Sequence, residues 1–140
     1  MADQTEYSGE RYDPLQANAL AHYDHHARYH FVKRSFQGGR LLDVGCGLGV
    51  GAAFLSESFD EAVGIDADDA AVREATRQRA SSRLSFSSVD DFVASGAAGF
   101  DVVTCLEVIE HTVAQHELLQ LLKRAVRPDG VVVISTPNRR

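Results

Sequence analysis

Alternating glycines with an acidic residue on either side form the most informative pattern in the sequence. The stretch LLDVGCGLGVG, residues 41–51, runs from an apolar segment into glycines, and Asp66 follows Gly47 after 19 residues. Glycine permits positive φ and lets ligand atoms approach backbone N–H groups that a Cβ would block. A carboxylate at the end of the next strand can accept hydrogen bonds from both ribose hydroxyls. The combination predicts a nucleoside-binding site, and the alternatives are a merely tight turn and Asp66 as a helix N-cap, for which Asp68 is better placed.

The spacing of the glycines narrows the class of nucleoside. A dinucleotide fingerprint, G-x-G-x-x-G, needs its third glycine at position 50, where this chain has Val50. Gly45, Gly47 and Gly49 instead form G-x-G-x-G. Asp43, just before the turn, would repel a pyrophosphate but could help to hold a cationic amino group, directly or through water. Its alternative role is to cap the amides of the glycine loop.

A second group of chemically capable side chains is Glu107, Glu110 and His111 in the stretch LEVIEH. Histidine can accept a proton near neutral pH, so His111 is the candidate base, with Glu107 and Glu110 as further catalytic candidates. The alternative for His111 is a helix N-terminal residue with its ring on the surface. The spacing would also suit a metal as a minority alternative, although no metal is predicted.

The elements that must position these residues alternate between short apolar segments and longer segments with helical periodicity. This alternation predicts an α/β fold, a Rossmann-like doubly wound sheet of about five parallel strands with helices on both faces. The predicted strands are residues 40–46, 61–66, 83–89, 100–106 and 130–136. The predicted helices are residues 49–58, 69–80, 90–95 and 113–126, the last of which is expected to stop at RPDG.

Residues 1–35 are predicted to form a helical lid on the substrate side, separate from a core of residues 36–140. Helical spacing in residues 15–36 predicts one or two helices laid over the end of the sheet. This face could stack on and hydrogen-bond to an acceptor, and its i, i+4 histidine pairs could alternatively chelate a transition metal. Its ring-bearing and basic side chains are His22, Tyr23, His25, His26, Arg28, Tyr29 and His30.

Composition limits the partners and the compartment. The 140 residues are 44% hydrophobic and carry a net charge of -6, which disfavours capture of nucleic acid or anionic membrane by charge. No apolar run approaches the roughly 20 residues that span a bilayer, and the polar N-terminus lacks a secretion signal. The two cysteines, Cys46 and Cys105, lie in apolar contexts, so reduced thiols and a cytoplasmic location are expected.

Taken in order, the motifs resemble those of the class I S-adenosylmethionine-dependent methyltransferases, over residues 10–138. LLDVGCGLGVG resembles the first motif, AVGIDAD the second, VDDF the segment that frames the adenine, and FDVVTCLEVIEH the fourth. LLKRAVRPDGVVVISTPN resembles the helix and fifth strand that follow. A narrower resemblance, carried by ERYDP and HHARY, is to bacterial methyltransferase domains encoded with surface-polysaccharide genes, some of them fused to glycosyltransferases.

The resemblance implies a set of residues that bind S-adenosylmethionine. The glycines would contact its methionine part, Asp66 its ribose hydroxyls and Asp90 its adenine amino group, although Asp90 is equally well explained as a helix cap. Val108 would line the pocket beside Glu107. The implied cofactor-binding residues are Asp43, Gly45, Cys46, Gly47, Gly49, Asp66, Ala67, Asp90, Asp91, Phe92, Leu106 and Glu107.

The function implied by the resemblance is methyl transfer to a small-molecule or carbohydrate-linked acceptor, with O-methylation expected. The first alternative is a catalytically incomplete module that binds S-adenosylmethionine; the second is a metal-assisted O-methyltransferase related to the ubiquinone-pathway or small-RNA enzymes. By resemblance, the last two strands of the seven-stranded fold are absent. The fifth strand, with VVVIS, would then be an exposed edge that could pair two copies as a homodimer.

Overall fold

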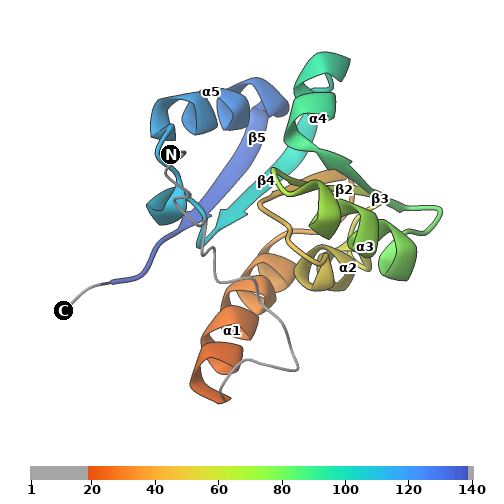
Figure 1. Cartoon of the computed structure of the whole chain (residues 1–140). Helices are drawn as coiled ribbons and strands as arrows, with labels where there is room; N and C mark the ends of the chain where they lie inside the picture. Colours follow the sequence, from red (N-terminus) through yellow and green to blue (C-terminus); the bar gives the residue numbers. More distant parts are fainter. Residues whose placement is uncertain (1–18, 139–140) are drawn as a thin grey trace.

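A computed structural model describes the backbone of residues 19–138 and the side chains of residues 26–138 (Figure 1). The helical backbone of residues 19–25 is therefore described without its side chains. The predicted roles of His22, Tyr23 and His25, and of the ERYDP element, lie outside the described side chains.

The centre of the molecule is a sheet of five parallel strands, as the sequence predicts. The strand order is β3-β2-β1-β4-β5, and every neighbouring pair is parallel. Parallel neighbours need a crossover connection, which the intervening helices supply. The strands are β1 Arg40–Val44, β2 Glu61–Asp66, β3 Leu84–Ser88, β4 Phe100–Leu106 and β5 Val126–Ser135.

Helices cover both faces of this sheet, which confirms the predicted doubly wound α/β architecture. Figure 1 shows α1, α2 and α3 on one side of the sheet and α4 and α5 on the other. Successive strand residues point to opposite faces, so Leu41 packs in the core under α1 and α2 while Leu42 packs in the core under α4 and α5. The helices are α1 Ala19–Ser35, α2 Val50–Ser56, α3 Asp69–Arg79, α4 Val89–Ser95 and α5 Gln115–Ala125, with a short 3-10 helix η1 Ile109–His111.

The C-terminal boundaries differ from the prediction. Helix α5 ends at Ala125, and β5 begins directly at Val126, so RPDG lies within the strand instead of separating it from the helix. Val126 pairs with Phe100, and the register then shifts, so that Val131 pairs with Val102. The turn residues are accommodated in this irregularity at the sheet edge, where a proline without an N–H costs little.

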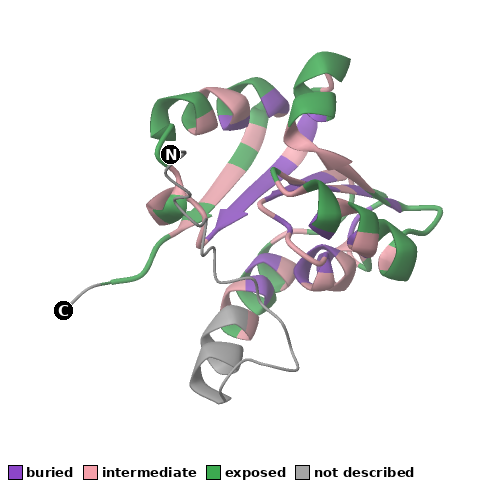
Figure 2. Cartoon of the chain, in the orientation of Figure 1, coloured by how far each residue is buried: buried purple, intermediate pink, exposed green. Residues whose placement is uncertain are grey.

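The predicted lid helix packs into the core over its described length. Tyr29 and Val32 of α1 are buried in the same cluster as Leu41 and Leu55. Figure 2 shows buried segments, in purple, along the described part of α1. This burial ties α1 to the face that carries α2, and the role of α1 as a lid over an acceptor stays a prediction. Among the described residues, no helix has the length and apolarity needed to cross a membrane.

Candidate functional site

The carboxyl ends of three neighbouring strands form the floor of the site. Because β1 lies between β2 and β4, the glycine loop after β1 is flanked by Asp66 at the end of β2 and Glu107 after β4. The amide of Gly45 donates to the Ile65 carbonyl at 2.8 Å, which ties the loop to β2. In open parallel sheets this edge is where ligands bind.

The glycines of the loop are needed for different physical reasons. Gly45, Gly47 and Gly49 adopt φ values of 77°, 54° and 79°, a region that disfavours other residues. A Cβ at Gly45 would overlap Val108, but a Cβ at Gly47 would meet no atom within 4 Å. Gly47 therefore marks the open part of the loop. Gly51, by contrast, leaves room for the Tyr29 ring, which a Cβ there would overlap, so the fourth glycine serves α1 and not a ligand.

Asp66 lies where the sequence predicts a ribose-binding carboxylate. Its Oδ2 accepts a hydrogen bond from the Gly47 amide at 2.9 Å, and its Oδ1 accepts one from the Asp68 amide at 2.9 Å. These two bonds from backbone amides fix the orientation of the Asp66 carboxylate beside the loop. The N-cap of α3 is Asp68, which accepts from the Ala71 amide at 3.1 Å, and the alternative of Asp66 as that cap is thereby excluded.

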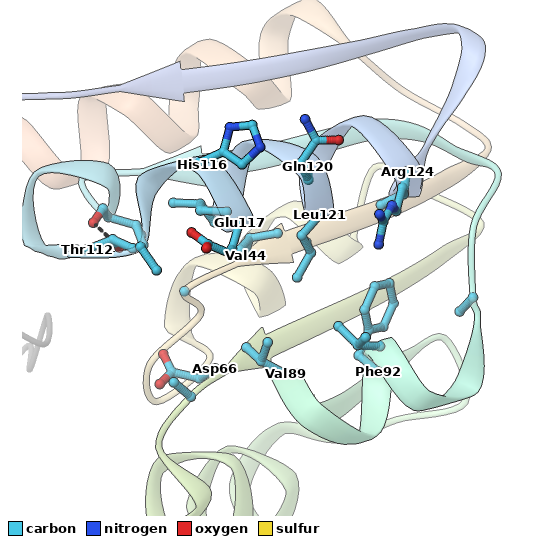
Figure 3. A pocket seen from close by; sticks show the side chains of 18 of the residues that line it. Val44, Asp66, Val89, Phe92, Thr112, His116, Glu117, Gln120, Leu121 and Arg124 are labelled. Atoms are coloured by element: carbon cyan, nitrogen blue, oxygen red, sulfur yellow. Dashed lines mark hydrogen bonds between the residues drawn. The ribbon is translucent and has the colours of Figure 1, made fainter.

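A cavity of about 980 Å³ opens from this carboxylate into the space between α4 and α5. Gly45, Asp66 and Ala67 line its sheet end. In Figure 3, Val89 and Phe92 lie on one side and Leu121 on the other. This size and mostly apolar lining suit a drug-sized ligand with an aromatic ring, held by a few polar groups.

The remaining predicted cofactor residues lie in two kinds of place. Cys46 and Leu106 are buried in the core under α1 and α2, and burial raises the pKa of the Cys46 thiol well above its usual range. Asp90 and Asp91 are exposed in the first turn of α4 and do not line the cavity. The α4 N-cap is Ser88, whose Oγ accepts from the Asp91 amide at 3.1 Å, so Asp90 is not the cap.

Asp43 is a fully buried carboxyl held by two hydroxyl groups. Thr104 Oγ1 donates to Asp43 Oδ1 at 2.7 Å, and Tyr29 OH donates to Oδ2 at 3.3 Å. Its side chain therefore does not cap the loop amides, and that alternative was wrong. Burial raises the pKa of Asp43 from 3.8 to about 7, and the hydrogen bonds from Thr104 and Tyr29 oppose the rise.

Glu107 begins the segment that follows β4. Its carboxylate Oε1 pairs with Arg28 Nε of α1 at 2.5 Å and accepts from Ser135 Oγ of β5 at 3.3 Å. Burial raises the pKa of Glu107, and the neighbouring Glu110 carboxyl raises it further, whereas the Arg28 guanidinium lowers it. The carboxyl groups of Glu107 and Glu110 are therefore neighbours at the end of β4, and the Arg28 guanidinium pairs with Glu107.

Glu110 and His111 complete this cluster beside the cavity. Both carboxylate oxygens of Glu110 are buried without a hydrogen-bond donor in the described part of the chain. His111 Nε2 lies 3.6 Å from Glu110 Oε1, and His111 also lines the cavity. Within residues 26–138, no three or more His, Cys, Asp and Glu side chains form a group that could hold a metal ion.

Three parts of the site were missed by sequence reasoning. No local pattern indicates that Arg28 pairs with Glu107 or that α5 forms a wall of the cavity. The third part is Thr104, which is fully buried and bonds to Asp43. A single hydroxyl in the apolar strand FDVVTCL was the available signal, because a buried hydroxyl needs a partner on the next strand.

Comparison with known proteins places this geometry in a known family. The model of the family described as "Methyltransferase domain" matches residues 17–140. A ubiquinone biosynthesis O-methyltransferase of Actinobacillus pleuropneumoniae serotype 5b (strain L20) is 34% identical over 110 residues, 73% of this chain and 47% of that protein. The protein of the same name from Caulobacter vibrioides is 30% identical over 129 residues, 89% of this chain and 50% of that protein.

Solved structures share the fold at lower identity. The N-methyltransferase NodS from Bradyrhizobium japonicum WM9, in complex with S-adenosyl-L-homocysteine, has a TM-score of 0.72 at 20% identity and covers 92% of this chain and 68% of its own. The [4+2]-cyclase SpnF has a TM-score of 0.70 at 22% identity and covers 90% of this chain and 49% of its own. The fold is therefore shared by proteins named for different reactions. The chain spans about half the length of the curated relatives it matches.

Proposed function

Since the chain belongs to the class I S-adenosylmethionine-dependent methyltransferase superfamily, we propose that it binds S-adenosylmethionine and catalyses transfer of its methyl group. The observation that carries the proposal is Asp66, which is oriented by two backbone amides and lines the cavity. The residues fit the cofactor because a ribose-binding carboxylate lies between an open glycine loop and an apolar slot.

The proposed binding assigns a part to each wall of the cavity. Asp66 accepts hydrogen bonds from the ribose hydroxyls, and Val89 and Phe92 pack against the adenine ring. The loop at Gly47 leaves space for the amino-acid part. When bound, S-adenosylmethionine supplies an electrophilic methyl group on a sulfonium. The protein therefore needs no nucleophile of its own, and its task is to align the acceptor and accept a proton.

His111 is the proposed proton acceptor. Its ring lines the cavity, and Glu110 Oε1 lies 3.6 Å from Nε2, where a carboxylate can orient the imidazole. An acceptor hydroxyl at the cavity would lose its proton to His111 as its oxygen takes the methyl group; the methyl–sulfur bond would break with its electron pair left on sulfur, and S-adenosyl-L-homocysteine would leave. Glu107 begins the segment that carries His111, and its contacts with Arg28 and Ser135 hold the start of that segment at the end of β4.

The proposed acceptor is a small-molecule or carbohydrate-linked hydroxyl. The relatives named as ubiquinone biosynthesis O-methyltransferases support oxygen as the acceptor atom. A net charge of -6 favours a neutral or cationic acceptor over nucleic acid. The proposed compartment is the cytoplasm, because Cys46 and Cys105 are both free and buried.

Calorimetric titration with S-adenosyl-L-homocysteine tests the cofactor site. We expect micromolar binding by the wild-type protein and a loss of at least about tenfold in Asp66→Ala, because two ribose hydrogen bonds to a charged acceptor are removed. Asp69→Ala is the matched control, since Asp69 is an exposed carboxylate three residues away. Equal affinity of the wild type and Asp66→Ala would contradict the assignment.

Methyl transfer is tested with S-adenosylmethionine labelled in its methyl group and a panel of hydroxylated acceptors or cell extract. We expect His111→Ala to lower the transfer rate by about 10²–10⁴-fold while cofactor binding is retained. Transfer at the wild-type rate in this variant would exclude His111 as the base. Cofactor binding without any transfer would favour the alternative of a module that binds S-adenosylmethionine but does not catalyse.

The edge strand β5 supports a proposal about a second copy of the chain. Among the described residues β5 is an edge strand whose Val131 and Ile134 side chains are 39% and 42% exposed, and an apolar edge strand can pair with another strand. We expect a dimer in light scattering at high protein concentration. A clean monomer under these conditions would contradict pairing through β5.

A further inference from the structure

Glu107 has an unusual backbone conformation. Its φ is 58°, and it is the only non-glycine residue with positive φ in the part of the chain that the structure describes. A glutamate in the left-handed region is strained relative to one in the right-handed helical region. Such a conformation persists only where surrounding contacts hold it.

Contacts from two elements hold Glu107 in place. Its amide donates to the Ser135 carbonyl at 3.0 Å, and Ser135 Oγ donates to its carboxylate at 3.3 Å. From the other side, Arg28 Nε of α1 reaches Glu107 Oε1 at 2.5 Å. Ser135 holds both the backbone and the side chain, but the only positive charge paired with this carboxylate among the described residues comes from Arg28. The side chains of Arg28 and Glu107 are 29% and 18% exposed, so water screens this pair only partly.

The conformation of Glu107 sets the direction of the following segment. Val108 packs against the Cα of Gly45 so closely that a Cβ there would overlap it. The 3-10 helix Ile109–His111 follows at once and carries the His111 ring to the cavity. A change of φ at residue 107 would therefore move Val108 away from the glycine loop and turn His111 relative to the cavity.

We propose that Arg28 is a positioning residue of the transferase site: by pairing with Glu107 it holds the left-handed turn that places His111 at the cavity. The inference rests on the proposed function for the role of His111. Arg28 itself does not line the cavity, so it acts through Glu107 and touches neither the proposed cofactor nor the reacting atoms.

The conformational part is tested without catalysis by NMR. A residue with positive φ has a short distance between its own amide proton and Hα, and therefore a strong nuclear Overhauser effect between them. We expect this effect at Glu107 in the wild-type protein and in Arg28→Lys, which keeps the charge, and its loss in Arg28→Gln. Lys33→Gln is the matched control, because Lys33 also joins α1 to another element through an ion pair of 2.5 Å, with Glu57.

The functional part is tested by kinetics on the same four proteins. We expect Arg28→Gln to lower kcat about 10–100-fold, since misplacement of a catalytic group by about 1 Å can have that effect. Affinity for S-adenosyl-L-homocysteine should change less than about twofold, because the contacts proposed for Asp66, Val89 and Phe92 are untouched. Arg28→Lys should recover most of kcat, and Lys33→Gln should resemble the wild type.

The outcomes separate this inference from the proposed function. A strong nuclear Overhauser effect between the amide proton and Hα of Glu107 in folded Arg28→Gln would overturn the inference. Loss of this effect with an unchanged kcat would also overturn it. An equal fall in cofactor affinity and kcat would show a general structural role and would also overturn it.

If the wild-type protein binds the cofactor but transfers no methyl group, the proposed function fails, and the NMR comparison alone decides whether Arg28 holds the turn. If Arg28→Gln does not fold, a wild-type-like kcat in Arg28→Lys supports the inference, and a kcat as low as that of His111→Ala overturns it.

Discussion

Two carboxyl clusters, one fully buried and one partly exposed, lie at the ends of the neighbouring strands β1 and β4, and consecutive residues of α1 contact them. Tyr29 contacts Asp43, whose two oxygens each accept a hydroxyl hydrogen bond. Arg28 contacts Glu107, whose neighbour Glu110 has two buried oxygens without a donor in the described part of the chain. The first cluster is satisfied within regular secondary structure, and the second is strained and under-satisfied. Strain that is retained in this way is typical of functional sites.

Of the two clusters, the one around the fully buried Asp43 is expected to cause most of the pH dependence of stability. Its pKa rises from 3.8 to about 7 on folding, so between these pH values the native state binds more protons than the unfolded state. The free energy of unfolding should therefore fall as pH rises from 4 to 7, by on the order of 4 kcal/mol in total. Urea unfolding at pH 5 and pH 8 measures this fall. Asp43→Asn should flatten the dependence and the exposed Asp69→Asn should not; parallel curves for the wild type and Asp43→Asn would assign the dependence elsewhere.

A smaller effect is expected when the Asp43 acceptor is removed altogether. Asp43→Ala removes the carboxyl group that accepts from the buried hydroxyls of Tyr29 and Thr104 and creates a small cavity, so we expect a loss of about 3 kcal/mol of unfolding free energy at pH 5. Asp43→Asn retains an acceptor oxygen and should lose less. Denaturation of both variants at this pH, where Asp43 is neutral, separates the hydrogen bonds from the charge. Equal losses would mean that the hydroxyls do not depend on this acceptor.

The smallest effect, with the opposite sign, is expected at the second cluster. Glu110→Gln replaces one of two facing carboxyls by an amide that can donate to Glu107, so stability at pH 8 should stay unchanged or rise by about 1 kcal/mol. The exposed Glu117→Gln provides the reference for a surface change. A clear loss of stability in Glu110→Gln would show that this carboxyl is structural, and the contrast between the clusters would disappear.

Local signals explain what the sequence predicts correctly. Apolar segments, helical periodicity and the glycine spacing predict the five strands and the placement of Asp66 beside the loop, because each depends on neighbours within one βαβ unit. The boundary at Val126 is not local, since it depends on pairing with Phe100 across the sheet. The Thr104–Asp43 bond joins residues 61 positions apart, and the Arg28–Glu107 pair joins residues still farther apart. Such contacts exist only once the strand order is known.

The place of Gly51 beneath Tyr29 carries a consequence for sequence variation. A side chain at position 51 would overlap the Tyr29 ring, and that ring supplies one of the two hydroxyls bound to Asp43. Three positions in different elements thus form one steric and polar unit. Among homologous chains, we expect Gly51, Tyr29 and Asp43 to be exchanged together: a larger residue at 51 should accompany a smaller one at 29 and a neutral residue at 43.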